Sequence, residues 1–196
     1  MVTRSITLAE FDARFDCDAD PWKTFSDRDE AAKRRAILRA MGPGPWGRVL
    51  ELGAGNGSNS AAIARRALRL DATEGTCAGT RLVASAIAGH DPRSRAIRLA
   101  LPGRFPRVRY DLIVIAELLY YLDDRTFAAT ARDAAFALRP GGRLVLAHHR
   151  IDFHDFAQHA AHIHRRFLAD TGERWSVRRI AGNRRWTVVA ARRDAR

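Results

Sequence analysis

The stretch that decides the fold is VLELGAGNGSNSAAIA, residues 49–64. A short apolar run is followed by glycine at every second position, at Gly53, Gly55 and Gly57, and then by a helix-like sequence. Glycine lets a ligand approach the backbone closely, and the N–H groups of such a loop and of the following helix start can bind an anion. A strand, a bare loop and a helix in this order predict a ligand site at the carboxyl edge of a parallel sheet.

Two common glycine-rich loops do not fit this stretch. The dinucleotide fingerprint G-x-G-x-x-G requires glycine where the chain has Ser58, and a P-loop requires a Gly-Lys-Ser/Thr sequence that is absent. The chain instead has one carboxylate before the loop, Glu51, and another at the end of the next apolar segment, Glu74. A carboxylate at the tip of the second strand can accept hydrogen bonds from both hydroxyls of a ribose. The pattern therefore predicts a nucleoside site.

The chain from the loop onward alternates between strand-like and helix-like segments. We expect strands at 48–52, 68–74, 96–99, 110–117 and 143–149, helices at 58–67, 80–89, 123–138 and 152–170, and strands of a hairpin at 174–180 and 184–192. Repeated strand–helix units predict a Rossmann-like α/β fold. Its sheet should be mostly parallel, with helices on both faces and a C-terminal antiparallel β-hairpin.

The segment before the loop has a different character. A short helix is expected at 7–15, an Asp-Pro-Trp turn at 20–22 and a helix from Asp27 to Met41, which Gly-Pro-Gly-Pro at 42–45 ends. Residues 1–44 should form an N-terminal lid or helical segment, and 45–196 the main domain, within one compact unit. Trp22 and Phe25 could cover a site and keep it dry, although Trp22 could equally serve packing alone.

Composition narrows the class of protein. The chain has 196 residues, 46% of them hydrophobic, which suits one globular domain. No apolar run approaches the roughly 18 residues that span a bilayer, and acidic residues interrupt the N-terminus, so we expect a soluble, cytoplasmic protein without a signal peptide. Cys17 and Cys77 provide neither a disulfide framework nor a metal-binding spacing, and are expected to be free thiols.

The formal net charge of +12 raises the possibility of a nucleic-acid partner. The basic residues are nearly all arginines and are spread along the whole chain; the only lysines are Lys23 and Lys33. The arginine pairs are not interleaved with aromatic residues, as they would be on a surface that binds single strands. We therefore expect a solvated basic surface, and a nucleic-acid partner is unlikely on these grounds.

At this point the chain resembles the class I S-adenosylmethionine-dependent methyltransferases. ELGAGNG resembles their first motif, and LRPGGRLVL (138–146) resembles the turn before their fifth strand. The resemblance implies a seven-stranded sheet, S-adenosyl-L-methionine as cofactor, the glycine loop around its methionine part and Glu74 on its ribose. The expected cofactor-binding residues are Trp22, Glu51, Gly53, Ala54, Gly55, Gly57, Glu74, Gly75, Ala100, Leu101 and Ala116.

One expected cofactor contact departs from the family pattern. Related enzymes usually place an aspartate at the end of the third strand, where it accepts a hydrogen bond from the adenine amino group, and this chain has Ala100 there. Loss of one such contact costs about 0.5–1.5 kcal/mol, which weakens binding without abolishing it. The backbone N–H of Leu101 could still reach the ring.

A narrower resemblance is to the NodS family of nodulation-type N-methyltransferases, which act on an amino sugar of a chitooligosaccharide. DADPW (18–22), YDLIVIAELLYYL (110–122) and the helix from Asp27 carry it. It favours N-methylation of a small, sugar-like acceptor. The acceptor could also be a hydroxyl compound, and the oligomeric state is left open.

The expected catalytic residues follow the fourth and fifth strands: Glu117, Tyr120, Tyr121 and His148. Glu117 could hold the acceptor and take its proton, or only contact the cofactor or a loop N–H. One of the two tyrosines should pack inward. His148, which also matches a histidine of some NodS-type relatives, is expected to face the site, with His149 a weaker candidate.

Other polar residues allow more than one interpretation. His159 and His162 share a face of the expected 152–170 helix, but no third ligand is evident and no metal is expected. Arg28, Lys33 and Arg34 could help to place a substrate or only solubilise their helix. The rival functions are a nucleic-acid methyltransferase and a non-catalytic cofactor-binding module. Base-methylating enzymes usually carry Asp/Asn-Pro-Pro-aromatic where this chain has AELL (116–119), and Ala100 is the best support for the non-catalytic module.

Overall fold

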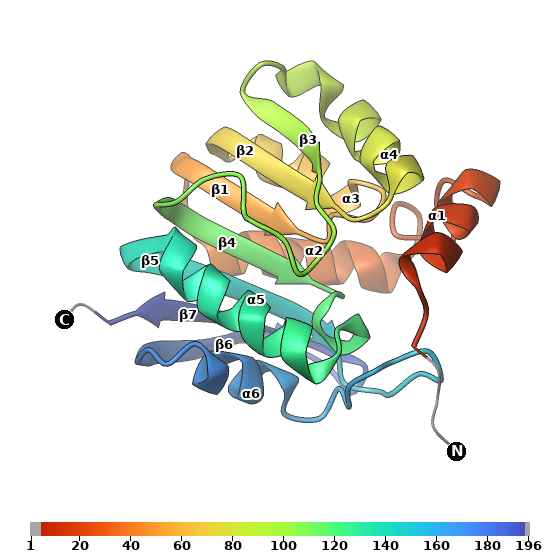
Figure 1. Ribbon diagram of the computed structural model, residues 1–196. Coiled ribbons are helices and arrows are strands. Elements are labelled where there is room, and N and C mark those ends of the chain that lie inside the picture. Colours follow the sequence, from red (N-terminus) through yellow and green to blue (C-terminus); the bar gives the residue numbers. More distant parts are fainter. Residues whose placement is uncertain (1–4, 195–196) are drawn as a thin grey trace.

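The computed structural model describes residues 5–194, and within them seven strands form one sheet in the order β3-β2-β1-β4-β5-β7-β6 (Figure 1). The strands are β1 (Trp46–Leu52), β2 (Ala67–Glu74), β3 (Ser94–Arg98), β4 (Tyr110–Ala116), β5 (Leu138–His149), β6 (Trp175–Gly182) and β7 (Trp186–Arg193). Neighbours from β3 to β5 pair in parallel, whereas β7 is antiparallel to both β5 and β6. The predicted fold class is confirmed.

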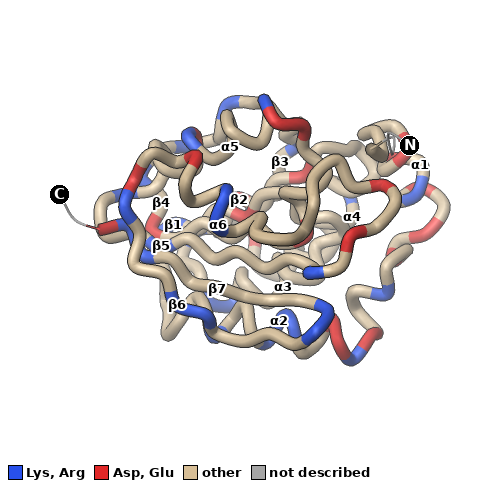
Figure 2. Tube along the Cα trace, turned by 90° about the horizontal axis from the view of Figure 1, so that it is seen from below, with Lys and Arg blue, Asp and Glu red and all other residues tan. Residues whose placement is uncertain are grey.

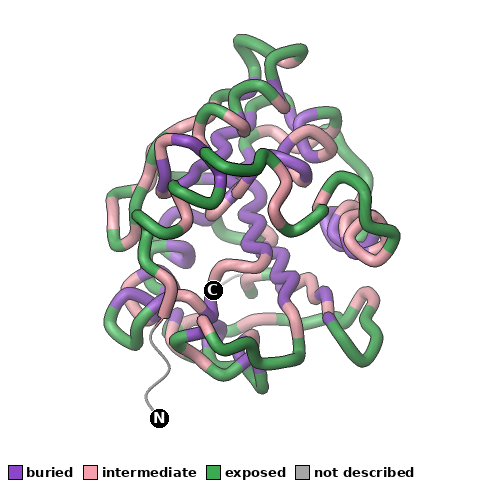
Figure 3. Tube along the Cα trace, turned by 90° about the vertical axis from the view of Figure 1, so that its right-hand side faces the viewer, coloured by how far each residue is buried: buried purple, intermediate pink, exposed green. Residues whose placement is uncertain are grey.

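Helices cover both faces of the sheet (Figure 1). One face carries α2 (Arg28–Met41), α3 (Ser58–Ala64) and α4 (Cys77–Ile87), and the other carries α5 (Asp124–Ala137) and α6 (Ile163–Asp170). Short 3₁₀ turns follow α4 at Ala88–His90 and β4 at Leu119–Tyr121. Two hydrophobic cores result, and the alternating side chains of β4 enter both, which explains why every residue of that strand is buried. Buried residues gather in the interior of the molecule, and exposed residues lie at its periphery (Figure 3).

Side-chain caps decide where several helices begin. Asp27 accepts hydrogen bonds from the N–H groups of Asp29 and Glu30 at the start of α2, close to the predicted boundary. Thr76 caps α4 by accepting from the N–H of Gly79, so this helix begins at Cys77 rather than near position 80 as expected.

The predicted helix 152–170 is wrong over its first half. Residues 150–162 are irregular, and only α6 is helical. Asp152 accepts a hydrogen bond from the N–H of Ala160 at 2.6 Å and lies 2.7 Å from Nδ1 of His159, so a carboxylate competes with the backbone for hydrogen bonds. His159 and His162 therefore share no helix face.

The N-terminal segment divides into two parts. Helix α1 (Leu8–Cys17) lies beside the ends of β1 and β2 and contacts α4, whereas α2 packs on β5, β6 and β7 as part of a helical layer (Figure 1). The role of α1 and the turn after it as a lid stays a prediction, and residues 1–4 of the expected lid lie outside the described residues. Within residues 5–194 no helix is both long and apolar enough to cross a membrane.

Candidate active site

A cavity of about 530 Å³ opens at the carboxyl ends of β1, β2 and β4, beneath α1. The strand order reverses between β1 and β4, and parallel sheets bind ligands at this kind of position. The wall combines the glycine loop, the tip of β2, the turn after β4, α1 and the irregular segment 153–156. Its size lies within the usual range for small-molecule sites.

The glycine loop offers bare backbone to this cavity. Gly53, Ala54 and Gly55 line it, and both glycines have positive φ angles, 65° and 60°. A Cβ built on Gly55 would meet nothing closer than Phe15 at 3.8 Å, so the space beside this backbone is open to a ligand. Gly57 does not line the cavity; a Cβ there would lie 2.7 Å from Ala86, so its role is close packing of α3 on α4.

Glu74 ends β2 in the cavity wall. Its Oε2 accepts a hydrogen bond from the N–H of Gly55 at 3.1 Å, and its Oε1 accepts from the N–H and hydroxyl of Thr76, each at 2.9 Å. Burial raises the pKa of Glu74, and these hydrogen bonds oppose the shift. Oε2 accepts only one of these hydrogen bonds and has a further lone pair, so the fixed carboxylate can still accept a hydrogen bond from a ribose hydroxyl.

Besides Gly57, two further expected cofactor residues lie outside the cavity wall. Glu51 is buried beneath the loop and accepts a hydrogen bond from Ser60 Oγ at 2.5 Å, and burial raises its pKa to about 7. Ala100 is exposed, whereas Leu99 and Leu101 line the cavity. Gly75 and Ala116 line it as expected.

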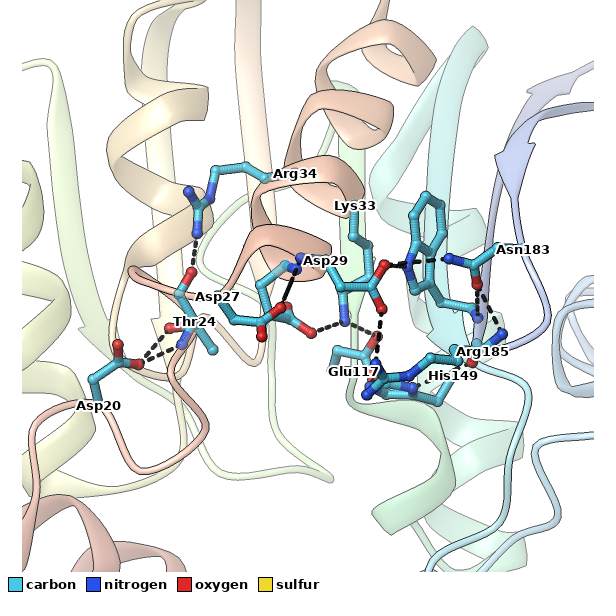
Figure 4. A network of polar contacts seen from close by, with 12 residues as sticks. Asp20, Thr24, Asp27, Asp29, Lys33, Arg34, Glu117, His149, Asn183 and Arg185 are labelled. Carbon is cyan, nitrogen blue, oxygen red and sulfur yellow. Dashed lines mark hydrogen bonds and ion pairs between the residues drawn. The ribbon is translucent and has the colours of Figure 1, made fainter.

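The Asp-Pro-Trp turn is tied to the glycine loop through Asn56. Asp20 Oδ1 accepts from the N–H of Thr24 at 2.6 Å (Figure 4). It also accepts from Nδ2 of Asn56 at 2.9 Å, and Asn56 Oδ1 accepts from the hydroxyl of Thr24 at 3.0 Å. The ring of Trp22 packs on Phe15 of α1, with centroids 5.3 Å apart, and lines the cavity. These contacts connect the turn and α1 to the glycine loop beside the cavity.

Glu117 follows β4 and is the centre of a polar network at the other end of the cavity (Figure 4). Its Oε1 lies 2.7 Å from Nζ of Lys33 on α2, its Oε2 lies 3.7 Å from Nε2 of His149, and the hydroxyl of Tyr120 donates to Oε2. Burial raises the pKa of Glu117, against the opposing effects of Lys33 and His149.

Lys33 is almost fully buried between two carboxylates. Its Nζ also lies 2.7 Å from Oε1 of Glu30. Burial alone would lower the pKa of Lys33, but Glu117 and Glu30 raise it above the ordinary value of lysine, so the side chain is charged. A helix-solubility role is therefore excluded for Lys33. Lys33 stands three residues before Ala36 and four before Ile37, and both of these residues are buried. This helical spacing places Lys33 on the buried face of α2, and it is the sequence signal that could have revealed the position of the lysine.

Both tyrosines of the turn line the cavity, but they differ in exposure. Tyr120 is buried and stacks on Phe156 with centroids 3.7 Å apart, whereas Tyr121 is half-buried and meets the ring of Phe11 edge-on at 5.0 Å. Tyr121 is thus the more accessible of the two. Aromatic residues of α1 and of segment 153–156 complete this wall. The sequence pattern of these two segments did not indicate a binding site.

The expectation that His148 faces the site is wrong. His148 is fully buried on the α6 side of β5, and its neighbour His149 lines the cavity. Side chains alternate across a strand: Val145 and Ala147 point to the α2 side of the sheet, and His149 follows them. The one-residue difference puts His149, and not His148, beside Glu117.

A family model described as "Methyltransferase domain" matches residues 25–191. The chain therefore belongs to this methyltransferase family, and the prediction of an S-adenosylmethionine-dependent methyltransferase is confirmed.

Several solved structures share the fold. The N-methyltransferase NodS from Bradyrhizobium japonicum WM9, in complex with S-adenosyl-L-homocysteine, is 18% identical, with a TM-score of 0.73 over 93% of this chain and 98% of that chain. A protein from Pseudomonas syringae described as a methyltransferase is 27% identical, with a TM-score of 0.70 over 85% and 100%. Geranyl diphosphate C-methyltransferase from Streptomyces coelicolor A3(2) is 14% identical, with a TM-score of 0.67 over 84% and 79%.

Proposed function

We propose that this protein transfers the methyl group of S-adenosyl-L-methionine to an amine nitrogen of a small, polar, sugar-like acceptor. The observation that carries the proposal is the placement of Glu117, a carboxylate at the tip of β4 that faces the cavity and is held by Lys33 and Tyr120. A fixed carboxylate can hold an amine, stabilise the positive charge that develops on its nitrogen, and accept its proton.

The charge of the cavity supports a cationic or amine ligand. Among residues 5–194, five carboxylates and two basic side chains other than histidine line it: Glu30, Glu74, Glu117, Asp123, Asp155, Arg14 and Lys33. This excess of negative charge contrasts with the formal net charge of +12 for the whole chain. An acidic pocket in a basic protein favours a sulfonium donor and an amine acceptor over a phosphorylated one.

The donor would lie along the glycine loop with its ribose at Glu74 and its adenine between Leu99 and Leu101. When bound, it would supply a methyl group that the acceptor nitrogen attacks in line: the N–C bond forms as the C–S bond breaks, and S-adenosyl-L-homocysteine is the leaving group. The residues of this chain then have three tasks: the loop and Glu74 fix the donor, Glu117 aims the acceptor nitrogen, and Trp22 with Phe11 and Phe15 keeps water out. The proton released from the nitrogen passes to Glu117, directly or through water.

The acceptor end of the cavity suits a sugar ring that bears an amine. Tyr121, Phe153 and Phe156 form an aromatic wall with ring centroids 5.2–5.3 Å apart, which can cover the apolar face of a ring. Polar groups of Asp155 and His154 at the same wall can meet its hydroxyls. The resemblance to NodS-type enzymes and the likeness to the NodS structure point to the same kind of acceptor.

The test is methyl transfer to paired acceptors. The protein is incubated with S-adenosyl-L-methionine and either a chitooligosaccharide with a free amine on its terminal sugar or the fully N-acetylated oligosaccharide, and products are analysed by mass spectrometry. We expect one added methyl group, on nitrogen, only with the free amine. Methylation of both compounds, or methylation at carbon or oxygen, would show that the acceptor group is another one.

A further inference from the structure

Two histidines, the buried His148 and the half-buried His164, lie beneath the turn that carries Glu117 and the two tyrosines. His148 is the penultimate residue of β5 and His164 lies on α6, with Nδ1 of His148 3.0 Å from Nε2 of His164. On its other side, Nε2 of His148 lies 3.3 Å from the backbone nitrogen of Leu118 and 3.2 Å from that of Leu119. Neither imidazole lines the cavity, so neither is placed to touch a ligand there.

The contacts define the tautomer of each ring. A backbone N–H can only donate, so Nε2 of His148 must be the unprotonated acceptor and its proton must be on Nδ1. That proton is donated to Nε2 of His164, whose own proton is then on Nδ1. Burial keeps both rings neutral: it holds the pKa of His148 well below its ordinary value and lowers that of His164 to about 4.

The turn itself has a backbone that needs support. Glu117 has a φ angle of 53°, which non-glycine residues rarely adopt. Three successive N–H groups are held from the end of β5: that of Glu117 by the carbonyl of Ala147 at 2.9 Å, and those of Leu118 and Leu119 by His148. The edge of the His148 ring also meets the ring of Tyr120, with centroids 5.4 Å apart.

We propose that His148, oriented by His164, is a positioning residue that fixes the turn after β4, so that the carboxylate of Glu117 is aimed at the acceptor. The histidine acts through the backbone of Leu118 and Leu119 and exchanges no proton with the acceptor. This inference rests on the proposed function for the role of Glu117, whereas the histidine contacts can be tested without any methyl transfer.

The first test concerns the histidines alone. Nitrogen-15 NMR of the labelled protein reports the tautomer of each imidazole. We expect His148 to be neutral with its proton on Nδ1 throughout about pH 5.5–8, where an ordinary histidine titrates. The amides of Leu118 and Leu119 should exchange slowly. A His148 ring with its proton on Nε2, a charged His148 at neutral pH, or unprotected amides would overturn the proposal, whatever the acceptor is.

The second test separates positioning from packing. In His148→Gln the side-chain oxygen can reach the position of Nε2. In His148→Asn the side chain is too short to place an oxygen there. His148→Leu fills the space but provides no hydrogen-bond acceptor. We expect kcat with the amine acceptor to fall roughly 100-fold in the Leu and Asn variants and to recover to within about fivefold of wild type in the Gln variant. The dissociation constant of S-adenosyl-L-homocysteine should change by less than about threefold, because Glu74 and the glycine loop hold it.

Equal kcat in the Leu and Gln variants would contradict the positioning role, since a buried apolar side chain serves packing at least as well. Should the Leu variant fail to fold, His164→Leu replaces it. This variant removes the acceptor of the Nδ1 proton but leaves His148 in place, and we expect roughly a tenfold lower kcat together with mixed His148 tautomers in the NMR spectrum. Wild-type kcat or an unchanged His148 tautomer in His164→Leu would count against the proposal.

Discussion

At the scale of single residues, two glutamates near the cavity have different environments: Glu117 is half-buried and Glu51 is fully buried. Glu117 has a charged lysine 2.7 Å away and faces the cavity, whereas Glu51 is sealed beneath the glycine loop, where the hydroxyl of Ser60 donates a hydrogen bond to it. A lysine stabilises the ionised form of the first carboxyl, and burial without a cation favours the protonated form of the second.

Replacing Glu117 tests its role as acceptor-binding base. Glu117→Gln keeps the shape and loses the negative charge, so we expect kcat to fall roughly 10²- to 10⁴-fold while S-adenosyl-L-homocysteine still binds. In the wild type, kcat should rise with pH through a pKa above the ordinary carboxyl value of 4.5, because burial raises the pKa of Glu117. Steady-state kinetics with Glu173→Gln, remote from the cavity, as control would measure both effects. A kcat in Glu117→Gln near that of the control would exclude the role.

Glu51 should make the protein less stable as the pH rises. Its pKa is raised from 4.5 to about 7 in the folded state, so the folded protein binds this proton more tightly than the unfolded chain. The free energy of unfolding should therefore fall between about pH 4.5 and 7, by at most on the order of 3 kcal/mol, and then level off. Urea denaturation at several pH values measures it. Glu51→Gln, which cannot ionise, should remove this contribution; identical pH slopes for both proteins would disprove it.

At the scale of structural elements, the site depends on contacts between segments that are distant in sequence. Asn56 of the glycine loop holds the Asp20 turn, and Asp29 at the start of α2 accepts from Nε1 of Trp186 at 2.8 Å and from Nδ2 of Asn183 at 3.2 Å (Figure 4). The hairpin β6–β7 thus fixes α2, and α2 delivers Lys33 to Glu117.

Loss of the Asn56 contacts should loosen the lid. Asn56→Ala removes the hydrogen bonds to Ala19, Asp20 and Thr24, so Trp22 should cover the cavity less often. We expect the dissociation constant of S-adenosyl-L-homocysteine, measured by calorimetry, to rise about tenfold, as for a loss of roughly 1.4 kcal/mol. Because both residues belong to one network, Asn56→Ala combined with Asp20→Ala should be less than additive. Strict additivity would mean that Asp20 and Asn56 act separately.

At the scale of the whole molecule, the positive charge is distributed and not gathered at the site. Lys and Arg occur on many elements and alternate with Asp and Glu (Figure 2). Several arginines lie on the two edge strands of the sheet, Arg95 and Arg98 on β3 and Arg178 and Arg179 on β6. Charges on an edge strand discourage pairing with another chain, which gives the arginines a role that requires no nucleic acid.

Salt dependence distinguishes a small acceptor from a nucleic acid. A protein that binds a nucleic acid through 6–10 phosphate contacts loses roughly 10³- to 10⁵-fold in affinity between 50 and 200 mM salt. We expect kcat/KM for the amine acceptor to change by less than about tenfold over the same range, because the acceptor contacts few charges. Competition assays with RNA and duplex DNA in the same buffers provide the comparison. Strong inhibition by nucleic acid at 200 mM salt would contradict this expectation.

The sequence by itself determined most of the elements and the end of the cavity that the glycine loop forms. Apolar runs of strand length, the glycine loop and the acidic tip of β2 are local signals, because strand period, turn conformation and backbone access depend on neighbouring residues. They located the alternating sheet, Gly53 to Gly55, Glu74 and the turn at Glu117. Only the tertiary structure decided that Lys33 meets a carboxylate 84 positions away, that His148 lies beneath the turn while His149 faces the cavity, and that residues 150–162 are not helical. The positions of the two histidines depend on the face of the sheet to which each side chain points. The Lys33 contact depends on which distant side chain neutralises a buried charge. The local sequence pattern specifies neither of these.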